Sequence, residues 1–168
     1  HPATVVHAAA YHTAVTVALA LRGLLLLTLV VAGCSLQMPA DPGGTLDDVR
    51  SGVLRVGASP EGELVRTDDG SVSGSEAALV KAFAESLDAE IEWTIGSEES
   101  LVDMLAHDEL DVVIGGITDQ TPWSSDVGMT RGYPGIPGSG GKPLVFLVEP
   151  GENRFLSELE QFLDQGVG

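Results

Sequence analysis

Hydrophobic positions follow two different spacings along residues 45–168. They alternate with polar positions in residues 53–57 and 91–95, as in strands, and recur every three or four positions in residues 75–87, as in an amphipathic helix. Alternation, apolar runs and helical spacing together predict strands over 53–57, 91–95, 110–114, 127–133 and 143–148, and helices over 75–87, 98–106 and 153–165. Because strands alternate with helices, we expect an α/β domain with a mostly parallel sheet flanked by helices.

Turn residues separate these elements. Asp69-Gly70 predicts a hairpin turn, and residues 134–141, with four glycines and two prolines, predict an irregular loop. The apolar stripe of the last helix predicts that Phe155, Leu159 and Phe162 are buried against the sheet.

A separate apolar run precedes the domain and ends at Cys34, the only cysteine of the chain. Arg22 lies before the run and small residues close it, which is typical of a secretory signal. Residues 31–34 resemble a bacterial lipobox, in which cleavage leaves the cysteine first and its thiol takes a diacylglycerol. A buried lone cysteine or an uncleaved anchor helix are the alternatives. We therefore expect a lipoprotein-type signal peptide over 1–33, a tether over 34–46 and one domain over 47–168.

This arrangement predicts a location outside the cytoplasm, in the periplasm or at the surface of a bacterium. Two acyl chains hold a protein stably on a membrane, so the lipid anchor would make the membrane a partner.

The charge balance narrows the range of partners. The formal net charge is −17, and without Arg22 of the expected signal peptide it is −18. So acidic a chain argues against nucleic acid and anionic lipid as partners. With one cysteine, no intramolecular disulfide can form, and His107 is the only histidine after residue 33, which argues against a histidine-rich metal site. No phosphate-binding motif or Ser-His-Asp arrangement is evident, so we expect no cofactor and no enzyme.

The order of several short motifs carries a family resemblance. Residues 52–57 form the first expected strand, Gly74 and Glu76 open the first long helix, and Asp111 begins an apolar run that ends in Gly115-Gly116 and Thr118. With Thr121-Pro122 and residues 130–133, these segments resemble the family 3 extracellular solute-binding proteins, the amino-acid-type receptors of ABC importers. The resemblance covers residues 48–133, and residues 143–165 resemble the returning strand and closing helix. It implies one lobe of a type II periplasmic-binding-protein fold, a small polar solute as ligand and an ABC permease or other membrane protein as partner.

Three departures from the family pattern refine that expectation. Only residues 134–142 stand where family members insert a second lobe, so we expect a single-lobe relative. Ser124 stands where the family has an arginine that grips the α-carboxylate of the ligand, so a guanidinium clamp is absent there. Residues 59–62 replace the aromatic pair that follows the first strand in the family.

The loop over residues 115–123 is the main site candidate, because it follows the carboxyl end of a buried strand, where open α/β sheets bind ligands. Glycine permits close backbone approach, threonine offers a hydroxyl, tryptophan can stack, and a glutamate or an arginine can bind a charged group. The predicted ligand-binding residues are Glu76, Gly116, Thr118, Trp123, Arg131 and Tyr133.

Each of these residues also has a structural interpretation. Thr118 or Thr121 can cap a helix after a tight turn, and Trp123 can fill the core. Glu76 suits the helix dipole, Arg131 can form a surface salt bridge, and Tyr133 can pack at the hinge. The acidic residues Asp108, Glu109 and Asp111 are typical of a solvated helix end.

Two functions follow. The first is the solute-binding component of an ABC transporter, anchored to the membrane as a lipoprotein. The alternative is a protein-interaction or sensor module that uses the open face of a single lobe.

Overall fold

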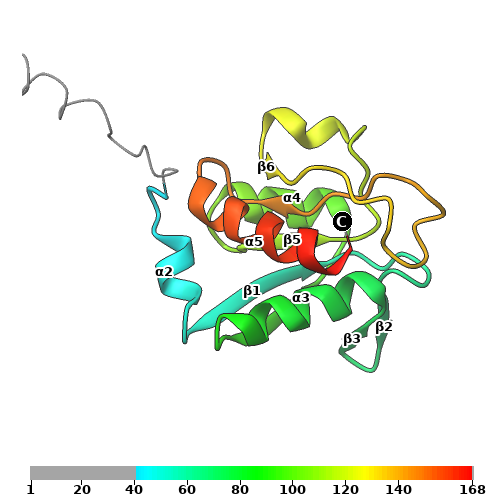
Figure 1. Cartoon of the computed structure of the whole chain (residues 1–168), viewed down its shortest axis with the longest axis horizontal. Coiled ribbons are helices and arrows are strands. Elements are labelled where there is room, and N and C mark those ends of the chain that lie inside the picture. Colours follow the sequence, from blue (N-terminus) through cyan, green and yellow to red (C-terminus); the bar gives the residue numbers. More distant parts are fainter. Residues whose placement is uncertain (1–40, 168) are drawn as a thin grey trace, which may run out of the picture. The chain divides into compact units, whose positions relative to one another are not determined.

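The computed structural model describes residues 41–167 (Figure 1). The predicted signal peptide, Cys34 and the first part of the predicted tether lie outside these residues. Within them, no helix is both long enough and apolar enough to cross a membrane.

Strands and helices alternate along the described part of the chain. Their bounds are α2 (Thr45–Val49), β1 (Val53–Ala58), β2 (Arg66–Asp68), β3 (Ser71–Ser73), α3 (Ser75–Ser86), β4 (Glu90–Ile95), α4 (Glu98–Ala106), β5 (Val112–Ile114), the 3-10 turn η2 (Pro122–Ser125), β6 (Gly128–Met129), β7 (Leu147–Val148) and α5 (Asn153–Gly166). The main sheet has the order β4-β1-β5-β7-β6, and β2 and β3 form a separate hairpin at the predicted Asp69-Gly70 turn.

The predicted α/β fold is confirmed, and its sheet is mixed. β1 is parallel to β4 and β5, whereas β7 is antiparallel to both β5 and β6. β7 runs back along β6 and pairs with it over only two positions, Gly128 with Val148 and Met129 with Leu147. The predicted strands 127–133 and 143–148 are therefore shorter than expected, although isolated bridges pair Leu144 with Thr118 and with Tyr133.

Helices cover both faces of the sheet. Val112 and Ile114 of β5 point into a core with α3 and α5, and Val113 points into a second core with α4. This alternation follows from the two-residue period of a strand, and it makes β5 a strand buried on both faces, as its apolar sequence predicts.

The last helix docks through the predicted stripe. Phe155 and Leu159 are at most 1% exposed, and the Phe155 ring lies 5.8 Å from that of Phe83 in α3, so α3 and α5 lie side by side (Figure 1). Phe162 was also predicted to be buried, but it is only partly buried and packs at the rim of this core.

The acidic residues after α4 are not all solvated, which corrects the helix-end interpretation for Asp111. This residue is 2% exposed, and its carboxylate accepts hydrogen bonds from the Arg55 backbone N–H at 2.7 Å and from Arg55 Nε at 3.1 Å. Arg55 also donates to the backbone oxygen and carboxylate of Asp108. The pair therefore ties the start of β5 to β1.

Candidate functional site

The 115–123 loop leaves the sheet beside the loop that follows β1. Because β1 and β5 are parallel, their carboxyl ends meet at one edge, where the Ser59 N–H donates to the Ile114 carbonyl at 2.9 Å. A methyl group on Gly115 would lie 2.6 Å from Cβ of Ser59. Glycine is therefore required for the two loops to pack this closely.

Glu76 and Gly116, both predicted site residues, are in direct contact. Glu76 lies in the first turn of α3 and is fully buried, and its Oε2 accepts the Gly116 N–H at 2.8 Å. Burial raises the pKa of Glu76 to about 7, while the N–H groups of Gly116 and Gly115 act in the opposite direction. Gly116 has φ +68°, a left-handed conformation that favours glycine. Glu76 therefore does more than interact favourably with the helix dipole, because its carboxylate also binds the turn that begins the loop.

Thr118 continues the loop with backbone interactions. Its carbonyl accepts the Thr121 N–H at 3.0 Å, and Thr121 Oγ1 accepts the Trp123 N–H at 3.4 Å. Thr121 therefore caps η2, one of the structural interpretations of the sequence. Hydrogen bonds therefore link Thr118 to Thr121 and Thr121 to Trp123.

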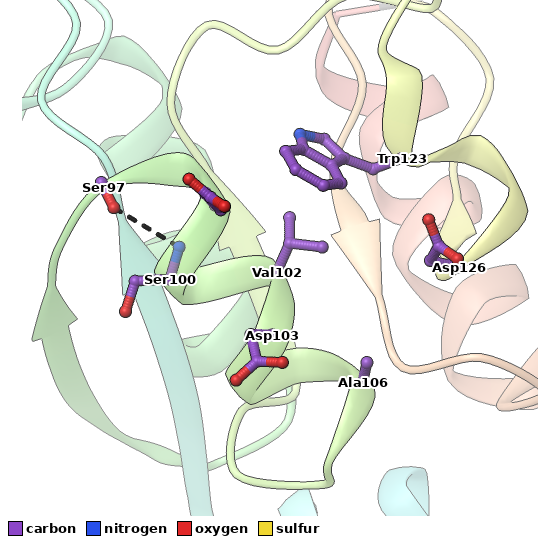
Figure 2. A pocket seen from close by; sticks show the side chains of 8 residues that line it. Ser97, Ser100, Val102, Asp103, Ala106, Trp123 and Asp126 are labelled. Atoms are coloured by element: carbon purple, nitrogen blue, oxygen red, sulfur yellow. Dashed lines mark hydrogen bonds between the residues drawn. The ribbon is translucent and has the colours of Figure 1, made fainter.

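Trp123 borders an open groove between η2 and α4, with a volume of about 570 Å³. Figure 2 shows its indole beside Val102, and its Nε1 donates to Oε1 of Glu98 at 2.6 Å. The groove is lined by Ser97, Glu99, Ser100, Val102, Asp103, Ala106, Trp123 and Asp126. Three of the lining side chains, those of Glu99, Asp103 and Asp126, are carboxylates. Among the described residues that line the groove, no side chain is basic.

The α4 side of this groove was not predicted as part of a site. Glu99 and Asp103 lie four residues apart on α4, so the helical period does place them on one face. The loop that packs against this face is set by the order of the strands in the sheet. That order cannot be predicted from the local sequence of α4.

Comparisons with known proteins identify the lineage. The sequence matches the bacterial extracellular solute-binding proteins, family 3, over residues 54–165. The chain belongs to this family. Its members are binding proteins that are typically extracellular or periplasmic. Among curated proteins, none matches this chain.

Solved structures agree on one lobe of this family. A point mutant of the arginine-bound domain 1 of TmArgBP, from T. maritima, has 23% identity and a TM-score of 0.63, over 71% of this chain and 96% of that domain. An ancestral arginine-binding protein bound to arginine has 15% identity and a TM-score of 0.56, over 67% and 91% of the respective chains. An ancestral cyclohexadienyl dehydratase also matches, with 25% identity and a TM-score of 0.49, over 58% of this chain and 40% of its own.

Arg131 and Tyr133 lie on the α5 side of this family 3 lobe. The Arg131 guanidinium lies 3.1 Å from carboxylate oxygens of both Glu160 and Asp164. Tyr133 is 3% exposed and its hydroxyl donates to Asp164 at 3.1 Å, and burial raises the pKa of this tyrosine. Arg131 therefore forms a salt bridge and Tyr133 is packed in the lobe, which agrees with the structural interpretations of the two residues. Their contact with a ligand stays a prediction.

The connector over residues 134–142 contains no helix or strand, as its sequence predicts, and it packs against the rest of the lobe. Ile136 is 2% exposed, and the Pro137 carbonyl accepts a hydrogen bond from Ser75 Oγ at 2.6 Å. A methyl group on Gly138 would lie 3.3 Å from Leu64, so the connector packs beside the loop after β1 (Figure 1). These nine residues are therefore packed against the rest of the lobe.

Proposed function

We propose that this chain is the solute-binding component of an ABC importer and that its ligand is an amino acid with a cationic side chain. The observation that carries the ligand class is the groove at Trp123, where an aromatic face and three carboxylates meet with no basic residue among the lining. A cation over an indole face contributes about 0.5–1 kcal/mol at an exposed site and more when desolvated. The arginine-bound relatives support the same class of ligand.

The proposed contacts follow the hydrogen-bonded loop. Trp123 would stack on the cationic group in the groove. Gly116 and Thr118 do not line this groove. They would contact the ligand through the Gly116 carbonyl and the Thr118 hydroxyl, because the Gly116 N–H is bonded to Glu76, which would support the turn from below. The side chains of Arg131 and Tyr133 already bind residues of α5. They would contact the ligand only when a second copy of the chain or a membrane partner covers the open side of the lobe.

We expect weak binding by a single copy of the chain. Pockets usually bury 70–90% or more of a drug-sized ligand, and one lobe with an open groove leaves much of an amino acid in water. A Kd of about 1 mM for L-arginine, equivalent to about 4 kcal/mol, is the expected result for a verified monomer.

Calorimetric titration with L-arginine, L-lysine, glycine and L-glutamate tests this expectation. Trp93, the other tryptophan of the chain, provides the matched controls. Trp93→Phe leaves Trp123 as the only tryptophan, so quenching of the tryptophan fluorescence by arginine reports on the groove itself. Trp123→Ala should abolish the heat of arginine binding, whereas Trp93→Ala should retain it. Equal binding of L-glutamate and L-arginine would contradict the proposal that the ligand has a cationic side chain. A micromolar Kd for a monomer would contradict the expectation that one open lobe binds weakly.

We further propose that the chain is a lipoprotein, with a signal peptide over 1–33, a tether from residue 34 and the binding domain over 47–168. The last tether residues are already hydrogen-bonded to the domain, because Glu152 accepts the N–H groups of Gly43 at 2.7 Å and Thr45 at 3.3 Å. A tether docked in this way would hold the lobe close to the membrane surface.

Cys34→Ala is therefore expected to move the protein from the membrane fraction to the exported soluble or precursor pool, because the thiol that takes the diacylglycerol is gone. Cell fractionation with radiolabelled palmitate measures both location and acylation, and Ser35→Ala is the control. A Cys34→Ala protein that is still processed and membrane-bound would contradict the lipid anchor. Recovery of a membrane protein with the lobe, in place of any amino acid, would favour the interaction or sensor module.

A further inference from the structure

The carboxyl group of Glu76 lies beneath the turn that begins the proposed ligand loop. The residue is 0% exposed, and while Oε2 accepts the Gly116 N–H, Oε1 is buried without a hydrogen-bond partner. Such a burial is unfavourable for an ionised carboxylate. The helix dipole would favour an acidic residue in this turn at full exposure as well. It therefore does not account for the burial.

The turn above Glu76 has little freedom to adapt. A methyl group on Gly116 would lie 2.5 Å from Cγ of Glu61, and one on Gly115 would lie 2.6 Å from Cβ of Ser59. With the loop after β1 packed on one side and the Glu76 carboxylate on the other, a change in the charge of Glu76 acts directly on the Gly116 N–H.

Few other charges face this carboxyl group. Residues 115–118, residues 56–60 and the connector over 134–141 contain no titratable side chain. In the loop after β1, Glu61 and Glu63 are the acidic residues, and the charge of Glu61 raises the pKa of Glu76 further. Along α3, the nearest basic residue is Lys81, whose Nζ donates to the Val72 carbonyl at 2.6 Å.

With a pKa of about 7, Glu76 changes charge around neutral pH. The ionised form strengthens the hydrogen bond from Gly116, because a carboxylate is a stronger acceptor than a carboxylic acid. It also places a negative charge beside the loop that leads through Thr118 and Thr121 to Trp123. Protonation removes the charge and weakens that bond.

We infer that Glu76 is a positioning residue that couples the conformation of the 115–118 turn to the external pH, and with it the affinity of the adjacent loop for cationic solutes. The second half of this inference rests on the proposed function, and the first half does not. A lobe of this kind would hold a cationic amino acid more tightly in a neutral to alkaline medium than in an acidic one.

Three Gly-Gly pairs in the chain make the first half directly measurable. When the full chain is labelled with glycine that carries ¹³C at the carbonyl and ¹⁵N at the amide, only a glycine that follows a glycine shows coupling between the two labels, and these are Gly44, Gly116 and Gly141. We expect the Gly116 amide shift to titrate with a midpoint within about one unit of pH 7. Gly141, in the connector, serves as the internal reference.

Glu76→Gln keeps the size of the side chain and removes its titration, so the Gly116 transition should disappear. Glu85→Gln, an exposed residue on the same helix, is the matched control and should retain it. A flat Gly116 shift in the unsubstituted chain between pH 5 and 9, or a transition that persists in Glu76→Gln, would overturn the inference.

The second half is tested with L-arginine, whose guanidinium is charged throughout the range of the experiment. We expect its Kd to be at least about fivefold lower at pH 8 than at pH 5.5 for the unsubstituted chain, and equal at the two pH values for Glu76→Gln. A pH-independent Kd in a chain whose Gly116 titrates would overturn the coupling. If arginine binds at neither pH, the proposed function fails, and the Gly116 titration alone decides whether Glu76 positions the turn.

Discussion

Phe155→Ala is expected to lower the free energy of unfolding by about 3–5 kcal/mol. Phe155 is fully buried between α5 and the sheet, and its ring meets that of Phe83 edge-on at 5.8 Å. Truncation removes the buried apolar surface, leaves a cavity and removes an aromatic contact of about 0.5–1.5 kcal/mol. Because a domain of this size is stable by only about 5–15 kcal/mol, this one substitution should bring the protein close to unfolding.

Urea denaturation followed by circular dichroism measures this effect. Leu156→Ala is the matched control, since Leu156 is the next residue of α5 and is only partly buried, so its loss should be clearly smaller. Equal losses for the two substitutions would mean that α5 does not dock through the Phe155 stripe.

The second large effect is a pH dependence of stability that belongs to Glu76. Its pKa is raised from an ordinary 4.5 to about 7 in the folded protein, so the folded state binds more protons than the unfolded state between these values. Stability from this group is therefore fully present below about pH 4.5 and falls as the pH rises toward 7 and beyond. From pH 5 to pH 8 the loss is roughly 2–3 kcal/mol, at 1.36 kcal/mol per pKa unit.

Urea midpoints at pH 5 and pH 8 measure this dependence. In Glu76→Gln the neutral side chain lacks the titration, so the substituted protein should gain roughly 2–3 kcal/mol relative to the unsubstituted chain between pH 5 and pH 8. Glu85→Gln should follow the unsubstituted chain. If Glu76→Gln loses stability as steeply with rising pH as the unsubstituted chain does, the Glu76 carboxyl group is not the source.

Local features of the fold are readable in the sequence, because hydrophobic periodicity and turn chemistry act over a few residues. The bounds of α4 agree with the prediction over 98–106, and the Ser97 side chain caps it by accepting the Ser100 N–H. The apolar run before Gly115 similarly predicts that β5 is buried on both faces. The family resemblance adds the order of these elements, which the structural comparisons confirm.

The chemistry of the candidate site depends on pairs far apart in the chain, and only the tertiary structure decides them. Asp111 and Arg55 are 56 residues apart, and Glu76 and Gly116 are 40 apart. Asp111 follows a helix and Glu76 lies in the first turn of one. Composition and spacing alone do not distinguish a solvated acidic residue at such a position from a buried one. The contact between the first turn of α3 and the glycine turn after β5 gives Glu76 its buried position and raised pKa. The packing of η2 against α4 places Trp123 beside carboxylates. A local pattern can therefore predict which residues are available for binding, whereas their grouping and charge state follow from the sheet order and the burial it creates.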